Sequence, residues 1–252
     1  MEVESVLITG SNRGIGLEFV RQLVQLKQPP RYVFATYRRG NNLKELKRIQ
    51  HSSVKSKVIL IKMDVTLQEE LEIARTIVEE IVGDRGLTLL INNAGILQEE
   101  ALPYVTPENL ELHFRVNTVA PLMVLQTMLP LLEKAASYHS GGMSVRKAAV
   151  LNISSTLGSI RNAELAQGLK APSYQISKAA LNMAMRVTAA SIREKGILVI
   201  MMCPGWVKTD MGGPNAQLTP DESVGAILKT LATLNETHHG IFMDNAGNEC
   251  PF

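Results

Sequence analysis

The sequence that decides the fold reads Val6-Leu7-Ile8-Thr9-Gly10-Ser11-Asn12-Arg13-Gly14-Ile15-Gly16, near the start of a chain of 252 residues. An apolar run leads into a turn with three glycines, and a helical pattern from Leu17 to Leu26 follows. Such a turn lets backbone N–H groups approach a pyrophosphate, to which the helix N-terminus adds partial positive charge. The spacing Gly-x-x-x-Gly-x-Gly differs from the commonest dinucleotide fingerprint. We predict a dinucleotide site here; the plainer alternative is an ordinary strand–turn–helix corner.

The end of the second strand-like run indicates which dinucleotide would bind. This run, Tyr32-Val33-Phe34-Ala35-Thr36-Tyr37, ends in Arg38-Arg39. Sites for NAD usually place an Asp or Glu there to bind the ribose hydroxyls, and none is present. Arg38, together with Arg13 from the turn, can form charge-assisted hydrogen bonds to a 2′-phosphate. We therefore predict NADPH or NADP+ as the cofactor. The alternative is that these arginines are solvated charges, which suits Arg39 better than Arg38.

Strand-like and helical segments alternate along the whole chain. Strands are expected at 3–9, 31–37, 57–63, 87–92, 147–153, 196–202 and 240–243. Helices are expected at 14–26, 41–50, 67–82, 106–134, 173–194 and 219–234. Continuous apolar runs such as Val58-Ile59-Leu60-Ile61 are typical of a parallel sheet buried on both faces. The pattern predicts an α/β fold: a doubly wound (Rossmann) parallel sheet of about seven strands flanked by helices, with residues 1–252 as one dinucleotide-binding domain.

A tyrosine and a lysine form the clearest candidate for chemistry. Tyr174 and Lys178 are four residues apart and share one face of a predicted helix. A free phenol has a pKa of about 10, and a fixed ammonium beside it should lower that pKa. The pair would then exchange a proton with a substrate oxygen near neutral pH. Such pairs are also common on exposed helices, so the spacing alone is a weak signal.

Five motifs, in this order, resemble the short-chain dehydrogenase/reductase family. They are Thr9-Gly10-x-x-x-Gly14-x-Gly16, Asn92-Asn93-Ala94-Gly95, Asn117, Ser155 and Tyr174-x-x-x-Lys178. The match runs from about Val3 to Asp244. More narrowly, Asn12-Arg13-Gly14, Leu157-Gly158-Ser159-Ile160 and residues 204–213 resemble the sniffer-type and C-factor-like carbonyl reductases. The resemblance implies the doubly wound fold and a nicotinamide-dependent oxidoreductase.

The resemblance also implies a role for each matching residue. Tyr174 would be the general acid, Lys178 would lower its pKa and hold the nicotinamide ribose, and Ser155, rather than Ser154, would hydrogen-bond the substrate carbonyl. Asn117 would bend its helix and hold a water that links Lys178 to solvent. The cofactor-binding residues would be Gly10, Ser11, Asn12, Arg13, Gly14, Ile15, Gly16, Arg38, Asp64, Val65, Asn93, Ala94, Gly95, Tyr174, Lys178, Pro204, Gly205, Val207 and Thr209.

Two segments depart from the compact pattern. Ser155 and Tyr174 are nineteen residues apart, whereas most family members have about a dozen. The extra segment, around Arg161 to Ala171, is expected to be a loop over the substrate mouth. The stretch Ala135 to Lys147, rich in Ser and Gly, is expected to be a flexible surface loop.

Composition and charge exclude several classes of protein. The hydrophobic share of 45% and the charged share of 20% are ordinary for a globular protein, and a net charge of +2 argues against a nucleic-acid binder. The five histidines lack ligand spacing, and Cys203 and Cys250 form no metal or redox motif, so we expect no metal. Cys203 is expected to be a packing residue.

No membrane association is expected. The longest apolar stretch, Val119 to Leu132, is interrupted by two prolines and Gln126, and it is too short to span a bilayer. We interpret it as a buried helix. The first strand is expected to start at Val3, which leaves no room for a signal or transit peptide before it. A cytoplasmic protein is the resulting expectation.

These observations predict an NADPH-dependent oxidoreductase with a small-molecule substrate, and the family resemblance implies that the substrate is an aldehyde, ketone or quinone whose carbonyl is reduced. Two alternatives remain: an NADP-dependent alcohol or hydroxysteroid dehydrogenase, and a non-catalytic nucleotide-sensing protein on the same scaffold. Alanines along the predicted helix 173–194 allow close approach of another surface, and the corresponding helix often forms a dimer interface in the family. A homodimer is therefore a further expectation, although packing against the sheet explains the alanines equally well.

Overall fold

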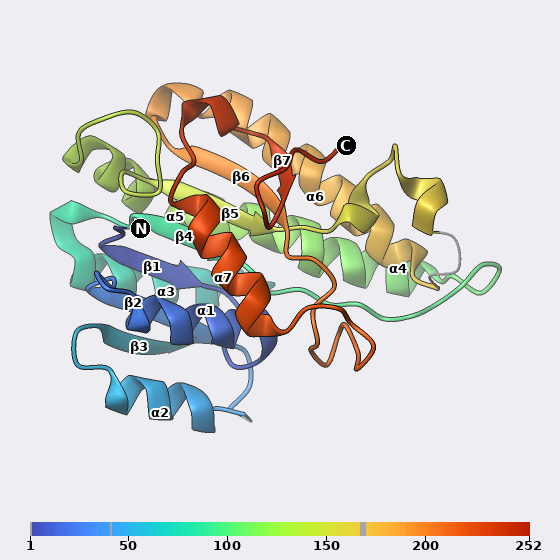
Figure 1. Ribbon diagram of the computed structural model, residues 1–252, viewed down its shortest axis with the longest axis horizontal. Coiled ribbons are helices and arrows are strands. Elements are labelled where there is room, and N and C mark those ends of the chain that lie inside the picture. The colour runs from blue at the N-terminus through green and yellow to red at the C-terminus, as the bar shows by residue number, and fades with distance from the viewer. Residues whose placement is uncertain (1, 41, 167–169) are drawn as a thin grey trace.

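The computed structural model describes residues 2–40, 42–166 and 170–252 (Figure 1). Within these ranges seven strands form one sheet: β1 (Ser5–Ile8), β2 (Tyr32–Tyr37), β3 (Lys57–Lys62), β4 (Leu89–Asn92), β5 (Ala149–Ile153), β6 (Leu198–Cys203) and β7 (Phe242–Asp244). Every neighbouring pair is parallel, in the order β3-β2-β1-β4-β5-β6-β7. The order reverses between β1 and β4, where doubly wound sheets bind their ligands.

Helices cover both faces of the sheet. The main ones are α1 (Gly14–Gln25), α2 (Lys44–Ser52), α3 (Gln68–Val82), α4 (Pro107–Phe114), α5 (Ala120–Tyr138), α6 (Pro172–Ser191) and α7 (Pro220–Leu231). Apolar residues of α1, α2 and α7 form one buried cluster with the sheet, and those of α3, α5 and α6 form the other, so these helices lie in two layers (Figure 1). Cys203 is buried in the second cluster, as expected of a packing residue.

The predicted fold class is confirmed, and the strand bounds agree with the expected ones to within two residues. Two expectations were wrong in detail. The helix expected at 106–134 is interrupted by a π-helical turn over Arg115–Val119, and it continues to Tyr138 instead of giving way to a loop at Ala135. The continuation follows from burial, since Ala135 and Ala136 pack in the core. The expected start of the second helix at Asn41 lies outside the described residues, and α2 begins at Lys44.

Counted together with its π-helical turn, the helix from Pro107 to Tyr138 is also longer than the apolar stretch suggested. Its 32 residues and a window with a mean hydropathy of 1.2 make it, within the described ranges, the one helix long and apolar enough to cross a membrane. However, 61% of that window is buried inside the protein, and the core helix of a globular protein passes the same test. Its packing against α3 agrees with the expected buried helix.

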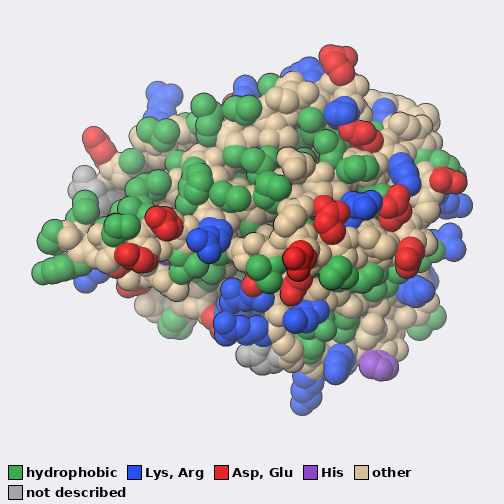
Figure 2. Space-filling model, turned by 180° about the vertical axis from the view of Figure 1, so that it is seen from behind, with side chains coloured by type: hydrophobic (Ala, Val, Ile, Leu, Met, Phe, Trp, Pro, Cys, Tyr) green, Lys and Arg blue, Asp and Glu red, His purple; other side chains and the backbone are tan. Residues whose placement is uncertain are grey.

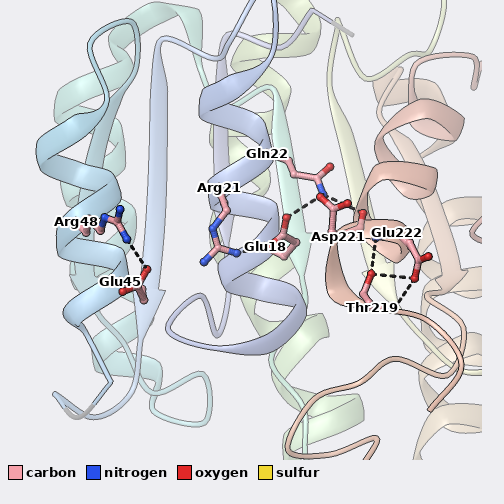
Figure 3. Close-up of polar contacts among 8 residues, drawn as sticks. All are labelled: Glu18, Arg21, Gln22, Glu45, Arg48, Thr219, Asp221 and Glu222. Atoms are coloured by element: carbon pink, nitrogen blue, oxygen red, sulfur yellow. Dashed lines mark hydrogen bonds and ion pairs between the residues drawn. The ribbon is translucent and has the colours of Figure 1, made fainter. Parts of the chain in front are cut away.

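The loop after β6 is fixed where it enters α7. Thr219 caps α7: its hydroxyl accepts from the Glu222 N–H at 3.2 Å, and the Glu222 carboxylate accepts from the Thr219 N–H at 2.8 Å (Figure 3). From α1, the Gln22 amide donates to the Asp221 carbonyl at 3.0 Å and to its carboxylate at 3.1 Å. These bonds hold the start of α7 against α1, and so keep the loop after β6 beside the glycine turn after β1.

Candidate active site

The glycine turn after β1 has the backbone that its sequence requires. Gly10 and Gly14 have φ angles of 68° and 54°, which non-glycine residues rarely adopt. A Cβ on Gly16 would overlap the Gly10 carbonyl oxygen, so α1 can start this close to the turn only with glycine there. Ser11 points inward: its N–H donates to the Thr36 carbonyl at 2.7 Å and its hydroxyl to the Ile8 carbonyl at 2.8 Å. Of the predicted turn residues, Ser11 is therefore turned away from the surface of the turn.

Side chains tie the glycine turn to the loop after β4. The Thr9 hydroxyl accepts from the N–H groups of Asn93 and Ala94, at 2.9 and 3.0 Å. In return, the Asn93 amide donates to the carbonyls of Thr9 and Gly10, at 2.9 and 3.1 Å. A Cβ on Gly95 would lie 3.2 Å from the Asn117 Oδ1 and 3.8 Å from the Lys178 Nζ. The two loops thus lie together, with Gly95 beside Lys178.

The loop after β6 closes against the glycine turn from the other side. The Arg13 guanidinium pairs with the Asp210 carboxylate at 2.6 Å, and both side chains are largely exposed. A Cβ on Gly14 would lie 3.2 Å from the Thr209 side chain. The Pro204 carbonyl accepts from the Ser223 hydroxyl at 2.7 Å, which anchors the start of this loop on α7. Arg13, predicted to face a 2′-phosphate, therefore has a carboxylate partner 197 residues away.

In the same loop, Gly205 has a φ angle of 82°, and Val207 is buried. The predicted residues after β2 and β3 lie at the same edge of the sheet. Arg38 is exposed and has no ion-pair partner in the part of the chain that the structure describes. Asp64 accepts from the N–H and hydroxyl of Thr66, at 2.9 and 2.7 Å, and Val65 packs against the core.

Ser155, Tyr174 and Lys178 meet at the carboxyl end of β5. All three are buried. The Lys178 ammonium donates to the Ile153 carbonyl at 2.8 Å and lies 5.7 Å from the centre of the Tyr174 ring, so the two side chains lie on the same side of α6. The backbone of Lys178 also fixes the turn after Ser155, because a Cβ on Gly158 would lie 2.7 Å from it.

Burial decides the protonation of this pair. It raises the pKa of Tyr174 to about 12, and the neighbouring Ser155 side chain lowers that value only in part. It lowers the pKa of Lys178 to about 8. The expected direction for Tyr174 was wrong, because removing the phenolate from water outweighs its stabilisation by neighbouring groups. At neutral pH the phenol is protonated and the amine is mostly charged.

Asn117 lies at the centre of the π-helical turn, fully buried. Its carbonyl oxygen accepts from the Ile96 N–H at 2.9 Å, and its amide donates to the Ile96 carbonyl and the Ser177 hydroxyl, both at 3.0 Å. Ser177 in turn donates to the Tyr174 carbonyl at 2.7 Å. Asn117 thereby joins the loop after β4 to the helix that carries Tyr174 and Lys178.

Several residues of this arrangement were not among the predicted site residues. Thr9 could have been predicted from the sequence, since it directly precedes the first glycine of the turn. Asp210 and Ser177 could not, because their partners depend on how distant segments of the chain meet. The segment from Arg161 to Ala171, expected to cover the substrate mouth, contains a 3₁₀ turn at Ala163–Ala166, and its residues 167–169 lie outside the described ranges.

Comparison with known proteins agrees with this geometry. Residues 4–219 match the family model for short chain dehydrogenases. The NADPH-bound carbonyl reductase from chicken fatty liver is 42% identical and superposes with a TM-score of 0.95 over the whole of both chains. The carbonyl reductase Sniffer of D. melanogaster is 36% identical, with the same TM-score and coverage. The C-signal of Myxococcus xanthus is 38% identical over 165 residues, which are 65% of this chain and 92% of the relative. The chain therefore belongs to the short-chain dehydrogenase family of oxidoreductases, and the resemblance to sniffer-type and C-factor-like carbonyl reductases is confirmed.

Proposed function

We propose that the chain reduces aldehyde, ketone or quinone carbonyls to alcohols with NADPH. One observation carries the proposal: the phenol of Tyr174 is buried beside Ser155 at the end of β5, and the Lys178 ammonium lies 5.7 Å from the centre of its ring. A phenol that keeps its proton at neutral pH suits a general acid. Both solved structures described above, from chicken fatty liver and D. melanogaster, are named carbonyl reductases, which supports the same substrate class.

The residues around the glycine turn fit NADPH. Gly10 and Gly14 have positive φ angles that other residues would adopt only with strain, and they shape the turn. The N-terminus of α1 lies at the same edge of the sheet. Arg38 offers an exposed guanidinium at the end of β2, and no carboxylate among residues 2–40, 42–166 and 170–252 forms an ion pair with it. A guanidinium there suits a 2′-phosphate, whereas a carboxylate would repel it. NADPH, when bound, supplies the hydride that forms the new C–H bond at the carbonyl carbon.

Three residues complete the reaction in this proposal. Ser155 donates a hydrogen bond to the carbonyl oxygen and stabilises the charge that develops there. The Tyr174 O–H bond breaks as its proton moves to that oxygen, so the products are an alcohol and NADP+. Lys178 can then return a proton to Tyr174, because the proton passes from a group with a pKa of about 8 to one with a pKa of about 12. The amine recovers its proton from water.

The alternative of an alcohol or hydroxysteroid dehydrogenase would use the same side chains, because a catalyst serves both directions of a reaction. Arg38 favours reduction, since a guanidinium at this position suits NADPH, the nicotinamide cofactor that cells keep mainly in its reduced form. A non-catalytic nucleotide-sensing protein is disfavoured, since the side chains of Asn117, Ser155, Tyr174 and Lys178 are all present and three of them gather at the end of β5.

We also propose that a second copy of the chain covers α6. Ile176, Met183 and Val187 lie along one face of this helix and are 55%, 66% and 54% exposed. Figure 2 shows the rear face of the molecule, where hydrophobic side chains gather on the half that carries α4 and α6. The double variant Met183→Glu, Val187→Glu should be monomeric in light scattering, whereas the unmodified chain should be dimeric. A monomeric unmodified chain would rule the dimer out.

The proposed reaction is tested by loss of NADPH absorbance with a panel of aldehydes, diketones and quinones. We expect turnover with members of the panel, and much slower formation of NADPH from NADP+ and the matching alcohols. Tyr174→Phe serves as the control, since it removes the acid while keeping the ring. A chain that binds NADPH and oxidises it with no member of the panel would refute the proposal.

A further inference from the structure

The loop after β4 is held at three successive points by side chains from other segments. Thr9 holds the N–H groups of Asn93 and Ala94, as described above. Asn117 holds both the N–H and the carbonyl of Ile96. The third anchor is His113 of α4, whose Nε2 accepts from the Gln98 N–H at 3.0 Å. Each anchor thus acts on a different part of the loop.

Both ring nitrogens of His113 are used. The side chain is completely buried, and its Nδ1 lies 2.8 Å from the Asn109 carbonyl oxygen, one turn back along α4. A carbonyl only accepts, so Nδ1 carries the proton and Nε2 presents its lone pair to Gln98. One neutral ring therefore joins its own helix to the loop. The ring lies one helical turn before Asn117, which holds the preceding part of the same loop.

The Gln98 end of the loop leads toward the substrate side. Beyond it, Glu100 donates its N–H to the Lys170 carbonyl at 2.8 Å, and Lys170 belongs to the segment between Ser155 and Tyr174. Leu102 and Tyr104, further along the same segment, are 79% and 77% exposed. By contrast, the part that faces the glycine turn has its own anchor at Thr9. The His113 anchor therefore acts on the half of the loop away from the glycine turn, where the Glu100 carboxylate also accepts from the Thr106 N–H at 2.8 Å.

We propose that His113 is a positioning residue, which sets the substrate side of this loop through Gln98 and leaves NADPH binding to the other two anchors. The inference rests on the proposed carbonyl reduction. Loss of the hydrogen bond between Gln98 and His113 should therefore raise the KM of the carbonyl substrate and leave the Kd of NADPH unchanged.

Two nearly isosteric variants test the anchor atom by atom. In His113→Gln, the amide oxygen reaches the place of Nε2 and can still accept from Gln98. In His113→Asn, the shorter amide reaches only the place of Nδ1. We expect His113→Asn to raise the carbonyl KM about 3- to 10-fold, the effect of one hydrogen bond, with an unchanged NADPH Kd, and His113→Gln to stay close to the unmodified chain. Equal losses in both variants, or a parallel change in NADPH Kd, would overturn the proposal.

A second pair of variants removes the same bond from the exposed side and leaves the core intact. Gln98→Pro deletes the N–H donor, and Gln98→Ala keeps it, so only the proline variant should raise the carbonyl KM. Amide hydrogen exchange at position 98 gives a readout that needs no turnover: it should be slow in the unmodified chain and in His113→Gln, and faster in His113→Asn. Fast exchange in the unmodified chain would overturn the anchor. An inactive chain with slow exchange would refute the carbonyl reductase alone.

Discussion

Raising the pH from 7 to 9 should remove most of the positive charge from Lys178 and about nine-tenths of the catalytic efficiency with it. Burial lowers the pKa of this amine to about 8, so about 90% of it is charged at pH 7 and about 10% at pH 9. Tyr174, with a pKa of about 12, stays protonated over the same range. If the ammonium is needed to hold NADPH and to return the proton, kcat/KM for NADPH should fall about tenfold between these pH values, because this ratio reports the groups of the free enzyme.

Stability moves in the opposite direction over this range, which separates loss of charge from unfolding. The unfolded chain binds a proton at Lys178 up to a pKa of 10.5, and the folded chain releases it at about 8. Between these values the unfolded state binds more protons, so Lys178 adds stability as the pH rises, by about 3 kcal/mol in all. Tyr174 affects the stability of the fold only above pH 10. Because its pKa is raised in the folded chain, the free energy of unfolding falls as the pH rises further. Thermal unfolding at pH 7 and pH 9 checks that the chain remains folded.

The assay measures kcat/KM for NADPH at saturating carbonyl substrate from pH 6 to pH 10, for the unmodified chain and for Lys178→Arg. A guanidinium keeps its charge throughout this range, so the arginine variant should be slower at pH 7 but should show no alkaline fall. A flat profile in the unmodified chain, or the same fall in both proteins, would refute the reasoning about Lys178.

Three further variants test other parts of the site. Tyr174→Phe should lower kcat by about 10²- to 10⁴-fold with NADPH affinity measured by fluorescence left intact; normal turnover would exclude Tyr174 as the acid. Arg38→Asp should weaken NADPH binding about tenfold or more relative to NADH, and Arg39→Asp is the matched control, with equal effects contradicting a specific role for Arg38. Gly16→Ala should lower both thermal stability and NADPH affinity, because its Cβ would overlap the Gly10 carbonyl. Gly40→Ala, with open space around it, is the control and should change neither. If Gly16→Ala left both quantities unchanged, the packing described for the turn would be wrong.

Much of the fold could be predicted because its signals are local. Buried parallel strands are continuous apolar runs, so the run Val58-Ile59-Leu60-Ile61 placed β3 correctly. Parallel strands also bring the loops that follow them to one edge, so the glycine turn and the Asn93–Gly95 loop could be expected to meet. The end of α5 at Tyr138 could not be expected, because Ser and Gly nearby indicate a loop while burial of Ala135 favours the helix.

The features of the site that could not be predicted depend on contacts between distant parts of the chain. The spacing of Tyr174 and Lys178 predicts their shared helix face but not the burial that raises the pKa of the phenol. Arg13 has its carboxylate partner at Asp210, far along the chain, and no local pattern indicates that pair. His113 lacked any ligand spacing, and its use of both ring nitrogens depends on where the loop after β4 passes.

Ser155 and Tyr174 are both held by rigid elements, so the segment between them can be replaced. Ser155 lies two residues after the end of β5, Tyr174 is in the first turn of α6, and the backbone of Lys178 packs closely against Gly158. The distance from serine to tyrosine is thus set by the sheet and the helix, whatever the length of chain between them. In the proposed reduction, replacing the residues after Ser159 and before Pro172 with the loop of another family member should therefore leave Tyr174 in place and change which carbonyl compounds are accepted.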